Sequence, residues 1–302
     1  IRQIEAYCRD NGFPTLMLNL ENKSILADLS LHPLNLLKFL PQTEMKTIVF
    51  IDEVQLHPDP SNFLKLLYDE QVERIKVIAT GSSAFYLDQR FKDSMAGRKK
   101  LFHLMTCSFD EYLYLSGKPE LVPELERLEQ NKEAKSANIE YLKNEWENYL
   151  LYGGYPAVIT EPAREEKIER LNEIRDSFVR RDLQDAGVVN ETAFYHLFRI
   201  LAAQTGKLLN VNGLASTLRI KNDTVQNYLS VLQKCFHIGL VKPFYKNLRK
   251  ELVKMPKVYL FDNGMRNALL NNFNTLQNRM DRGELWENYV FKTLAEKHGI
   301  EM

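Results

Sequence analysis

The stretch Ile48-Val49-Phe50-Ile51-Asp52-Glu53-Val54-Gln55 decides how this chain is interpreted. A short apolar run, mostly of β-branched residues, leads directly into two adjacent carboxylates. Such a run is typical of a strand that is buried on both faces of a parallel sheet. In α/β sheets, ligands bind at the carboxyl ends of the strands, so Asp52 and Glu53 stand where a ligand site is expected. A strand that ends in a solvated Asp-Glu turn is the alternative interpretation.

A second β-rich run, Ile75-Lys76-Val77-Ile78-Ala79, follows a helical stretch and ends in Thr80-Gly81-Ser82-Ser83. The hydroxyls of Thr80, Ser82 and Ser83 can each donate a hydrogen bond to a phosphate oxygen or to water. Taken alone, Thr-Gly-Ser-Ser is an ordinary turn and helix cap. Its position one strand after the two carboxylates favours a shared polar site at one edge of the sheet.

Strands and helices alternate along the first part of the chain, which is the α/β signature. We expect its strands at residues 15–20, 47–51 and 75–80, and near Lys100-Leu101-Phe102-His103-Leu104. The rest of the chain reads as mostly α-helical. We therefore expect an α/β core at 1–115, a helical connector at 116–205, a winged helix-turn-helix at 206–256 and the beginning of a further α/β domain at 257–302.

The segment from Leu209 to Phe244 has the pattern of a helix-turn-helix with a wing. Asn212 is expected to cap a first short helix, and Asn222 or Asp223 a second, ahead of the apolar strand Gly239-Leu240-Val241. A cluster of cationic residues surrounds the expected wing: Lys246, Arg249, Lys250, Lys254 and Lys257. The pattern predicts that the second helix and the wing contact DNA. A winged helix that serves only in packing is the alternative.

In their order and spacing, these motifs resemble a prokaryotic AAA-type ATPase whose core is followed by a C-terminal domain of unknown function. In the core the resemblance rests on Ile51–Gln55, Thr80–Ser83, Ser94–Arg98 and Ser108–Leu113. Later segments resemble the second domain: Leu151–Pro156, Val179–Leu183, Lys257–Gly264 and Gly283–Asn288. The resemblance implies a P-loop NTPase parallel sheet of the additional-strand class, followed by a winged-helix region and the start of a nuclease-like domain.

The resemblance also implies ATP and Mg²⁺ as cofactors, with residue roles that follow the family's motifs. Asp52 would hold Mg²⁺ through water, and Glu53 would orient or deprotonate the attacking water. The hydroxyls that follow the second run would sense the γ-phosphate. Arg98 would serve as an arginine finger, in cis or from a neighbouring subunit. A solvated basic turn is the alternative for Arg98.

One departure from the family concerns the loop that cradles the phosphates. The pattern G-x-x-x-x-G-K-[ST] does not occur in the 302 residues. The chain starts at Ile1, within what reads as the helix that follows such a loop, and stops at Met302, where another strand is expected to begin. We therefore expect a fragment that lacks the Walker A loop and the C-terminal end, and that is inactive as an ATPase by itself.

The C-terminal segment allows another class of function, because families of this kind often end in a nuclease-like fold. Glu287, within Gly283-Glu284-Leu285-Trp286-Glu287-Asn288, is the candidate first acid of a metal site whose other ligands would lie past Met302. A surface glutamate on a helix, flanked by core residues Trp286 and Val290, is the alternative.

Composition restricts the remaining choices. Forty cationic and forty anionic residues give zero net charge, so bulk charge does not favour nucleic acid. No apolar run reaches the roughly 18 residues that span a membrane. Three widely spaced cysteines indicate a reducing compartment. We expect a cytoplasmic ATPase, with DNA and a second copy of the chain as candidate partners. The alternatives are a non-catalytic DNA-binding or scaffold protein with a degenerate nucleotide site, and a nuclease completed beyond residue 302.

Overall fold

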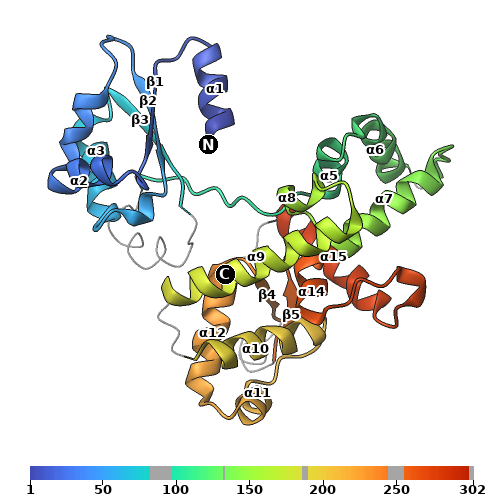
Figure 1. Ribbon diagram of the computed structural model, residues 1–302. Helices are drawn as coiled ribbons and strands as arrows, with labels where there is room; N and C mark the ends of the chain where they lie inside the picture. Colours follow the sequence, from blue (N-terminus) through green and yellow to red (C-terminus); the bar gives the residue numbers. More distant parts are fainter. Residues whose placement is uncertain (82–96, 132, 186–189, 244–254, 299–302) are drawn as a thin grey trace. The chain divides into compact units, whose positions relative to one another are not determined.

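The computed structural model describes residues 1–81, 97–131, 133–185, 190–243 and 255–298. For residues 179–185 it describes the backbone but not the side chains. The chain divides into two compact units, Ile1–Phe102 (unit 1) and His103–Met302 (unit 2), which are described separately. Both are drawn in Figure 1. Over the described ranges, no helix combines the length and the apolar character needed to cross a membrane.

Unit 1 is built on a three-stranded parallel sheet in the order β1-β2-β3. The strands are β1 (Thr15–Asn19), β2 (Thr47–Asp52) and β3 (Ile75–Ala79), which confirms three of the expected strands. Helix α1 lies on the opposite side of this sheet from α3 (Figure 1). The helices of the unit are α1 (Arg2–Asp10), α2 (Lys23–Leu31) and α3 (Pro60–Gln71), with 3-10 turns η1 (Pro33–Phe39) and η2 (Val54–Leu56). The mixed α/β arrangement is compatible with a P-loop NTPase.

The central strand β2 explains why its sequence is apolar almost throughout. It pairs with β1 on one edge and with β3 on the other, and Val49, Phe50 and Ile51 are fully buried. Helices on both faces remove alternate side chains from water, so apolar residues are favoured on both faces. The core around the strand consists of Leu18, Leu20, Leu29, Leu36, Val49, Ile51, Val54, Phe63, Leu67 and Ile75.

The expected strand at Lys100–Leu104 is wrong. Residues 100–104 have no strand structure, and the side chains of Leu101, Phe102 and Leu104 are exposed. A strand needs a hydrogen-bonding neighbour, and within the described ranges β3 pairs only with β2. The apolar composition of the segment favours a β-strand, but a strand also requires a neighbouring strand to pair with.

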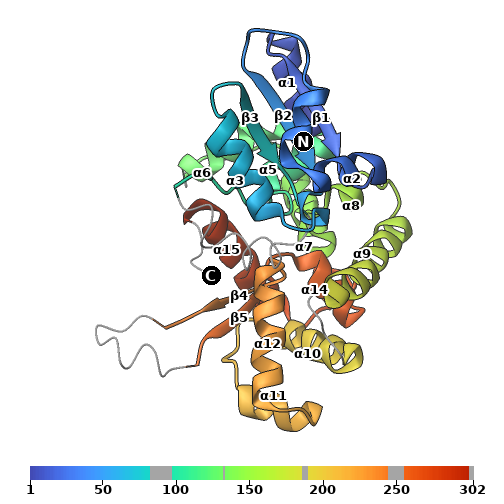
Figure 2. The same cartoon turned by 90° about the vertical axis from the view of Figure 1, so that its left-hand side faces the viewer.

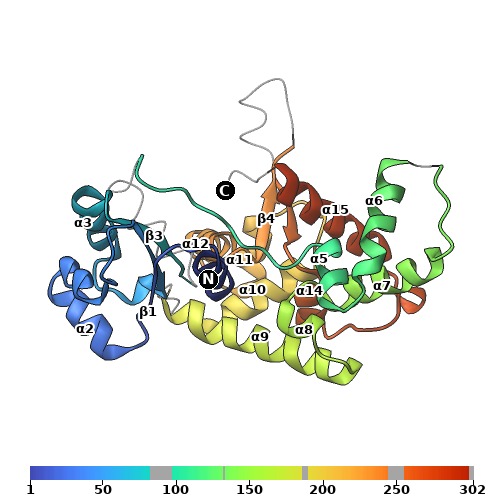
Figure 3. The same ribbon diagram turned by 90° about the horizontal axis from the view of Figure 1, so that it is seen from above.

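Unit 2 is mostly helical. Figure 3 shows α5, α6 and α7 together at one end of the unit, with α9 extending away from them. In chain order its elements are α5 (Phe109–Leu115), η3 (Pro119–Leu121), α6 (Val122–Gln130), α7 (Ile139–Tyr152), α8 (Pro156–Ile159), α9 (Arg164–Asp185), α10 (Glu191–Ala203), α11 (Val211–Leu218), α12 (Asn222–Lys234), β4 (Ile238–Val241), β5 (Lys257–Leu260), α14 (Asn263–Leu270), η4 (Leu276–Asn278) and α15 (Arg282–His298).

Helix α14 is the centre of unit 2, because its residues from Asn263 to Leu269 are all buried. Asp262 caps it: one carboxylate oxygen accepts from the backbone N–H of Met265 (2.9 Å) and the other from Gly154 (2.8 Å). Gly153 has a φ of 75°, and a Cβ there would overlap the Asp262 carboxylate. A Cβ on Gly264 would overlap the Tyr152 carbonyl. The glycines therefore permit close backbone approach.

Helices α11 and α12 are followed by an antiparallel hairpin of β4 and β5, and Figure 2 shows α12 beside the hairpin. The expected caps are wrong. Asn210 caps α11 by accepting from the N–H of Gly213, whereas Asn212 accepts from the side chain of Asn222 (2.7 Å). Lys221 precedes α12 without a side-chain cap. The winged-helix assignment and the four-part division of the chain stay predictions.

An ion-pair network links α14 to the residues that precede α15. Asp281 receives Nη1 of Arg266 (2.7 Å) and both Nε and Nη2 of Arg279 (2.8 Å each). The hydrogen bonds from Arg279, and then those from Arg266, hold the pKa of Asp281 well below its usual range. Both guanidinium groups are almost wholly buried, so they depend on this carboxylate for charge compensation.

We predict that Asp281→Asn lowers the unfolding free energy of unit 2 by about 3 kcal/mol at pH 7, because it leaves two buried cations without a counter-charge. The folded pKa of Asp281 is depressed, so its contribution is present above the unfolded value of about 3.9 and is lost as pH falls below it. The difference from wild type should therefore narrow progressively as pH falls below about 4, towards the depressed pKa of the folded state.

Tryptophan fluorescence during urea unfolding measures this effect selectively, since both tryptophans, Trp146 and Trp286, lie in unit 2. Glu140→Gln is the control: it breaks an exposed pair with Lys143 and should cost less than about 0.5 kcal/mol. An Asp281→Asn variant as stable as this control at pH 7 would contradict the prediction.

Candidate functional site

The parallel register brings the polar ends of the three strands to one edge of the sheet in unit 1. Asn19, the last residue of β1, lies opposite Asp52, the last residue of β2. Thr80 immediately follows β3, which pairs with β2 through Ile51 and Ala79. The carboxyl edge of the sheet is therefore where the sequence placed a ligand site.

Asp52 and Thr80 are joined directly. The Thr80 hydroxyl donates a hydrogen bond to Oδ1 of Asp52, and both residues are half-buried. The backbone fixes this pairing, because Thr80 N–H donates to Ile51 O and Val54 N–H donates to Thr80 O, each at 2.9 Å. The structure therefore brings a hydroxyl from beside the neighbouring strand into contact with Asp52.

Glu53 has an unusual backbone conformation for a residue with a side chain. Its φ and ψ are 57° and 45°, in the left-handed region, which costs an L-residue roughly 1–2 kcal/mol. The chain reverses there and enters η2, with Leu56 N–H donating to Glu53 O at 3.0 Å. The side-chain amide of Gln55 donates to Oε2 of Glu53. Strain of this kind occurs preferentially at functional sites.

Arg98 is not brought to this group. Arg98 pairs instead with Asp69 on α3, with Nε 2.7 Å from Oδ1, and both side chains are partly exposed. Ser82 and Ser83 lie outside the described residues. Asn19 and Gln55, which had been given no role, are the additions at this edge. The end of the first apolar run indicates Asn19, whereas no local sequence signal indicates Gln55.

The donor set at this edge is consistent with Mg²⁺ but not with a metal held by protein ligands alone. In the part of the chain that the structure describes, no group of three or more His, Cys, Asp or Glu side chains is placed to hold a metal ion. Mg²⁺ keeps several waters and is usually bound through one or two carboxylates together with substrate phosphates. Asp52, with its oriented carboxylate, fits that mode of binding.

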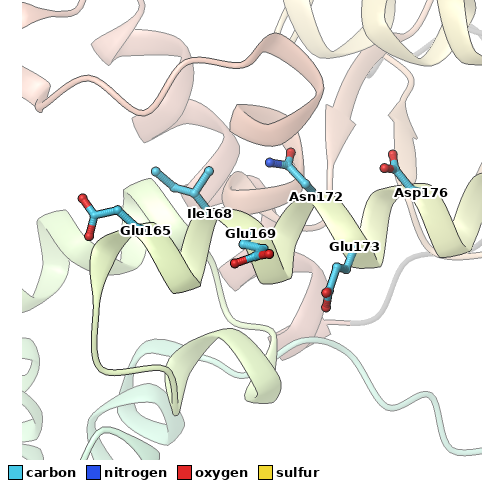
Figure 4. Close-up of a pocket in the computed structure, with 6 residues that line it drawn as sticks. All are labelled: Glu165, Ile168, Glu169, Asn172, Glu173 and Asp176. Atoms are coloured by element: carbon cyan, nitrogen blue, oxygen red, sulfur yellow. The ribbon is translucent and has the colours of Figure 1, made fainter.

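A hollow on unit 2 lies along one helix, and it does not coincide with the carboxyl edge. Figure 4 shows its lining side chains on α9: Glu165, Ile168, Glu169, Asn172, Glu173 and Asp176. Glu173 is paired with Arg170 at 2.6 Å, and Asp176 with Arg175 at 2.9 Å. This partly neutralised helix surface supplies no catalytic constellation.

Glu287, the candidate nuclease acid, is engaged by two side chains of β5. Its Oε1 accepts from Lys257 Nζ (2.9 Å) and from the Tyr259 hydroxyl (2.7 Å). The hydrogen bond from Lys257 has the largest effect and, together with that from Tyr259, lowers the pKa of Glu287. Glu287 thus anchors the hairpin to α15, and Lys257 already has a counter-charge. The nuclease-like assignment and the role of Glu287 in it stay predictions.

Two family models match the chain. Residues 3–113 match a model described as an AAA domain, which supports an AAA-type P-loop ATPase family and, at a coarse level, nucleotide binding and ATPase activity. The AAA match contains the whole carboxyl edge, from Asn19 to Thr80. Residues 143–276 match a model described as a domain of unknown function (DUF8612).

Curated relatives resemble the chain at a distance. Uncharacterized protein Rv2008c of Mycobacterium tuberculosis is 25% identical over 251 residues, which cover 82% of this chain and 50% of the relative. Uncharacterized protein MJ1637 of Methanocaldococcus jannaschii is 27% identical over 260 residues, which cover 82% of this chain and 53% of the relative. The chain thus spans about half the length of the curated relatives it matches.

The left-handed conformation of Glu53 leads to a prediction about stability. Glu53→Gly should be more stable than Glu53→Ala by about 1 kcal/mol, because glycine adopts positive φ without a steric penalty. Hydrogen exchange of peptides covering β1 to β3 measures the opening free energy of unit 1. The same pair of substitutions at Glu21, whose φ is not positive, should give the opposite order. Equal stability of the two Glu53 variants would argue against backbone strain.

Proposed function

We propose that the chain binds Mg²⁺-ATP at the carboxyl edge of the unit 1 sheet and takes part in its hydrolysis. The observation that carries the proposal is the group formed by Asp52, Glu53 and Thr80. Asp52 ends the central strand, a hydroxyl from the neighbouring strand orients its carboxylate, and a second carboxylate follows directly. The match of residues 3–113 to an AAA domain supports the same function.

Each residue of the group has a distinct part. Thr80 holds Oδ1 of Asp52, which leaves Oδ2 to accept a hydrogen bond from a Mg²⁺-bound water. Glu53 accepts a proton from the water that attacks phosphorus, or orients that water. Bound Mg²⁺-ATP supplies the phosphoryl group that is transferred to water. Ser82 and Ser83 remain proposed γ-phosphate sensors, and Arg98 would have to leave Asp69 to act as a finger.

The ATPase proposal has to be tested with the complete gene product. This sequence contains no G-x-x-x-x-G-K-[ST] loop, and the chain spans about half of its relatives, so turnover must be measured with whatever sequence the gene encodes on either side. A cytoplasmic location and self-association belong to the same proposal.

In the complete gene product, Glu53→Gln should retain ATP affinity within about two-fold but lower kcat by about 100-fold or more, because an amide cannot accept the proton from water. Phosphate release measures turnover, and equilibrium binding of a fluorescent ATP analogue measures affinity. Glu21→Gln, which changes an exposed carboxylate after β1, is the matched control. Wild-type turnover in Glu53→Gln would remove Glu53 from the mechanism.

A second candidate function, DNA binding, is favoured by the helix pair α11–α12 and the hairpin that follows it. Arg219 and Lys221 are exposed at the turn between the two helices, and Gln226 and Asn227 are exposed on α12. Lys257 is a weaker candidate for a phosphate contact, because Glu287 offsets its charge. DNA binding is thus proposed for the turn rather than for the base of the hairpin.

If the turn contacts phosphates, duplex affinity should fall steeply with salt, and Lys221→Ala should reduce the slope of log K against log salt by about one. Lys257→Ala is the matched control and should leave the slope unchanged. Fluorescence anisotropy with a labelled duplex between low and physiological salt provides the measurement. Salt-independent affinity, or equal effects of the two variants, would contradict DNA contact at the turn.

A further inference from the structure

Gln55 is the residue at the carboxyl edge whose contact is not yet explained by the proposed reaction. It occupies the middle of η2, two residues after Glu53, and it is half-buried. Because Glu53 takes the left-handed conformation, the chain reverses and brings the Gln55 side chain back against the Glu53 carboxylate. Its Nε2 donates to Oε2 of Glu53.

The contact engages one oxygen of the Glu53 carboxylate, Oε2. Within the described part of the chain, Oε1 of Glu53 has no hydrogen-bond partner, so it can accept a hydrogen bond from water. The carboxylate itself is attached to a backbone that is held on both sides, by Thr80 N–H on Ile51 O and by Val54 N–H on Thr80 O. Gln55 therefore removes the remaining freedom, which is rotation of the Glu53 side chain.

The chemical character of the donor also matters. A primary amide is neutral at every pH of interest, so it can stabilise an ionised carboxylate without adding charge to a site that receives a triphosphate. A lysine or arginine in its place would form an ion pair with Glu53 and compete with the attacking water for the carboxylate. A glutamine therefore donates to the carboxylate without adding a charge that competes with water.

We propose that Gln55 is a positioning residue for Glu53: it fixes the rotamer of the carboxylate so that Oε1 faces the attacking water. This inference rests on the proposed ATPase function. A misplaced general base loses rate without losing substrate affinity, since the base contacts water and not the nucleotide. The effect of Gln55 is thus expected in kcat rather than in ATP affinity.

The contact can be tested first without nucleotide, on the 302-residue chain itself. With glutamine labelled in ¹⁵N, the side-chain amide resonances of Gln55 should shift in Glu53→Ala and stay in place in Glu21→Ala. Unchanged Gln55 resonances in Glu53→Ala would show that the hydrogen bond does not form, and would overturn the proposal.

The functional test uses Gln55→Ala and Gln55→Glu in the complete gene product, with Gln71→Ala at the end of α3 as the half-buried control. Gln55→Ala should lower kcat about ten-fold with ATP affinity unchanged within about two-fold. Gln55→Glu should move the acid limb of the kcat–pH profile upward by about one unit, because two carboxylates in contact resist joint ionisation. A purely structural role would change thermal stability and leave that limb in place.

The outcomes separate the two proposals. If both Gln55 variants keep the kcat and the pH profile of the wild type, the proposed role of Gln55 is overturned and the ATPase proposal stands. Loss of ATP affinity in parallel with kcat overturns it as well, because it indicates damage to the nucleotide site. Absence of ATP turnover in the wild-type complete gene product overturns both.

Discussion

The burial of β2 between two parallel neighbours is the constraint on which the candidate site depends. A strand that is covered on both faces can hold polar groups only where it leaves the sheet, and Asp52 and Glu53 stand at that point. The parallel direction of β3 then brings Thr80 to the same edge, where its hydroxyl reaches Asp52. Apolar packing within the sheet thus positions the two carboxylates at its carboxyl edge.

A different device organises unit 2. Its centre is a helix whose polar residues are buried and fully occupied: Asn267, for example, donates to the carbonyls of Leu150 and Leu151 at the end of α7. Capping by Asp262 and the absence of side chains at Gly153 and Gly264 let α7 and α14 approach closely. The contacts of Asp262, Gly153 and Gly264 therefore have an explanation in the packing of these two helices.

The sequence was sufficient for the elements whose signal is local. The three strands of unit 1 follow from continuous apolar runs, and the polar edge follows from where those runs end. It was insufficient where the outcome depends on a partner distant in sequence. Leu101 and Phe102 have β-forming composition, but among the described residues no strand pairs with them. Arg98 has the charge of an arginine finger but forms an ion pair with Asp69. Neither outcome can be predicted from the local periodicity of the sequence.

The contact of Gln55 with Glu53 was missed for another reason. Nothing in the residue types predicts that a glutamate will adopt positive φ, and only that conformation turns Gln55 back towards the carboxylate. The left-handed turn was thus the one part of the site that required the structure. By contrast, the pairing of Asp52 with a hydroxyl of the next strand needed only the assumption of a parallel sheet.

The central claim is that the carboxyl edge of β1, β2 and β3 is a Mg²⁺-nucleotide site. A crystal structure of the complete gene product with a non-hydrolysable ATP analogue and Mn²⁺ in place of Mg²⁺ tests it most directly, since anomalous scattering locates the metal. Our account predicts the Mn²⁺ peak next to Asp52, bridged by water, with the Glu53 carboxylate facing the terminal phosphate. Metal and nucleotide bound away from this edge, with Asp52 still held by Thr80 alone, would contradict it.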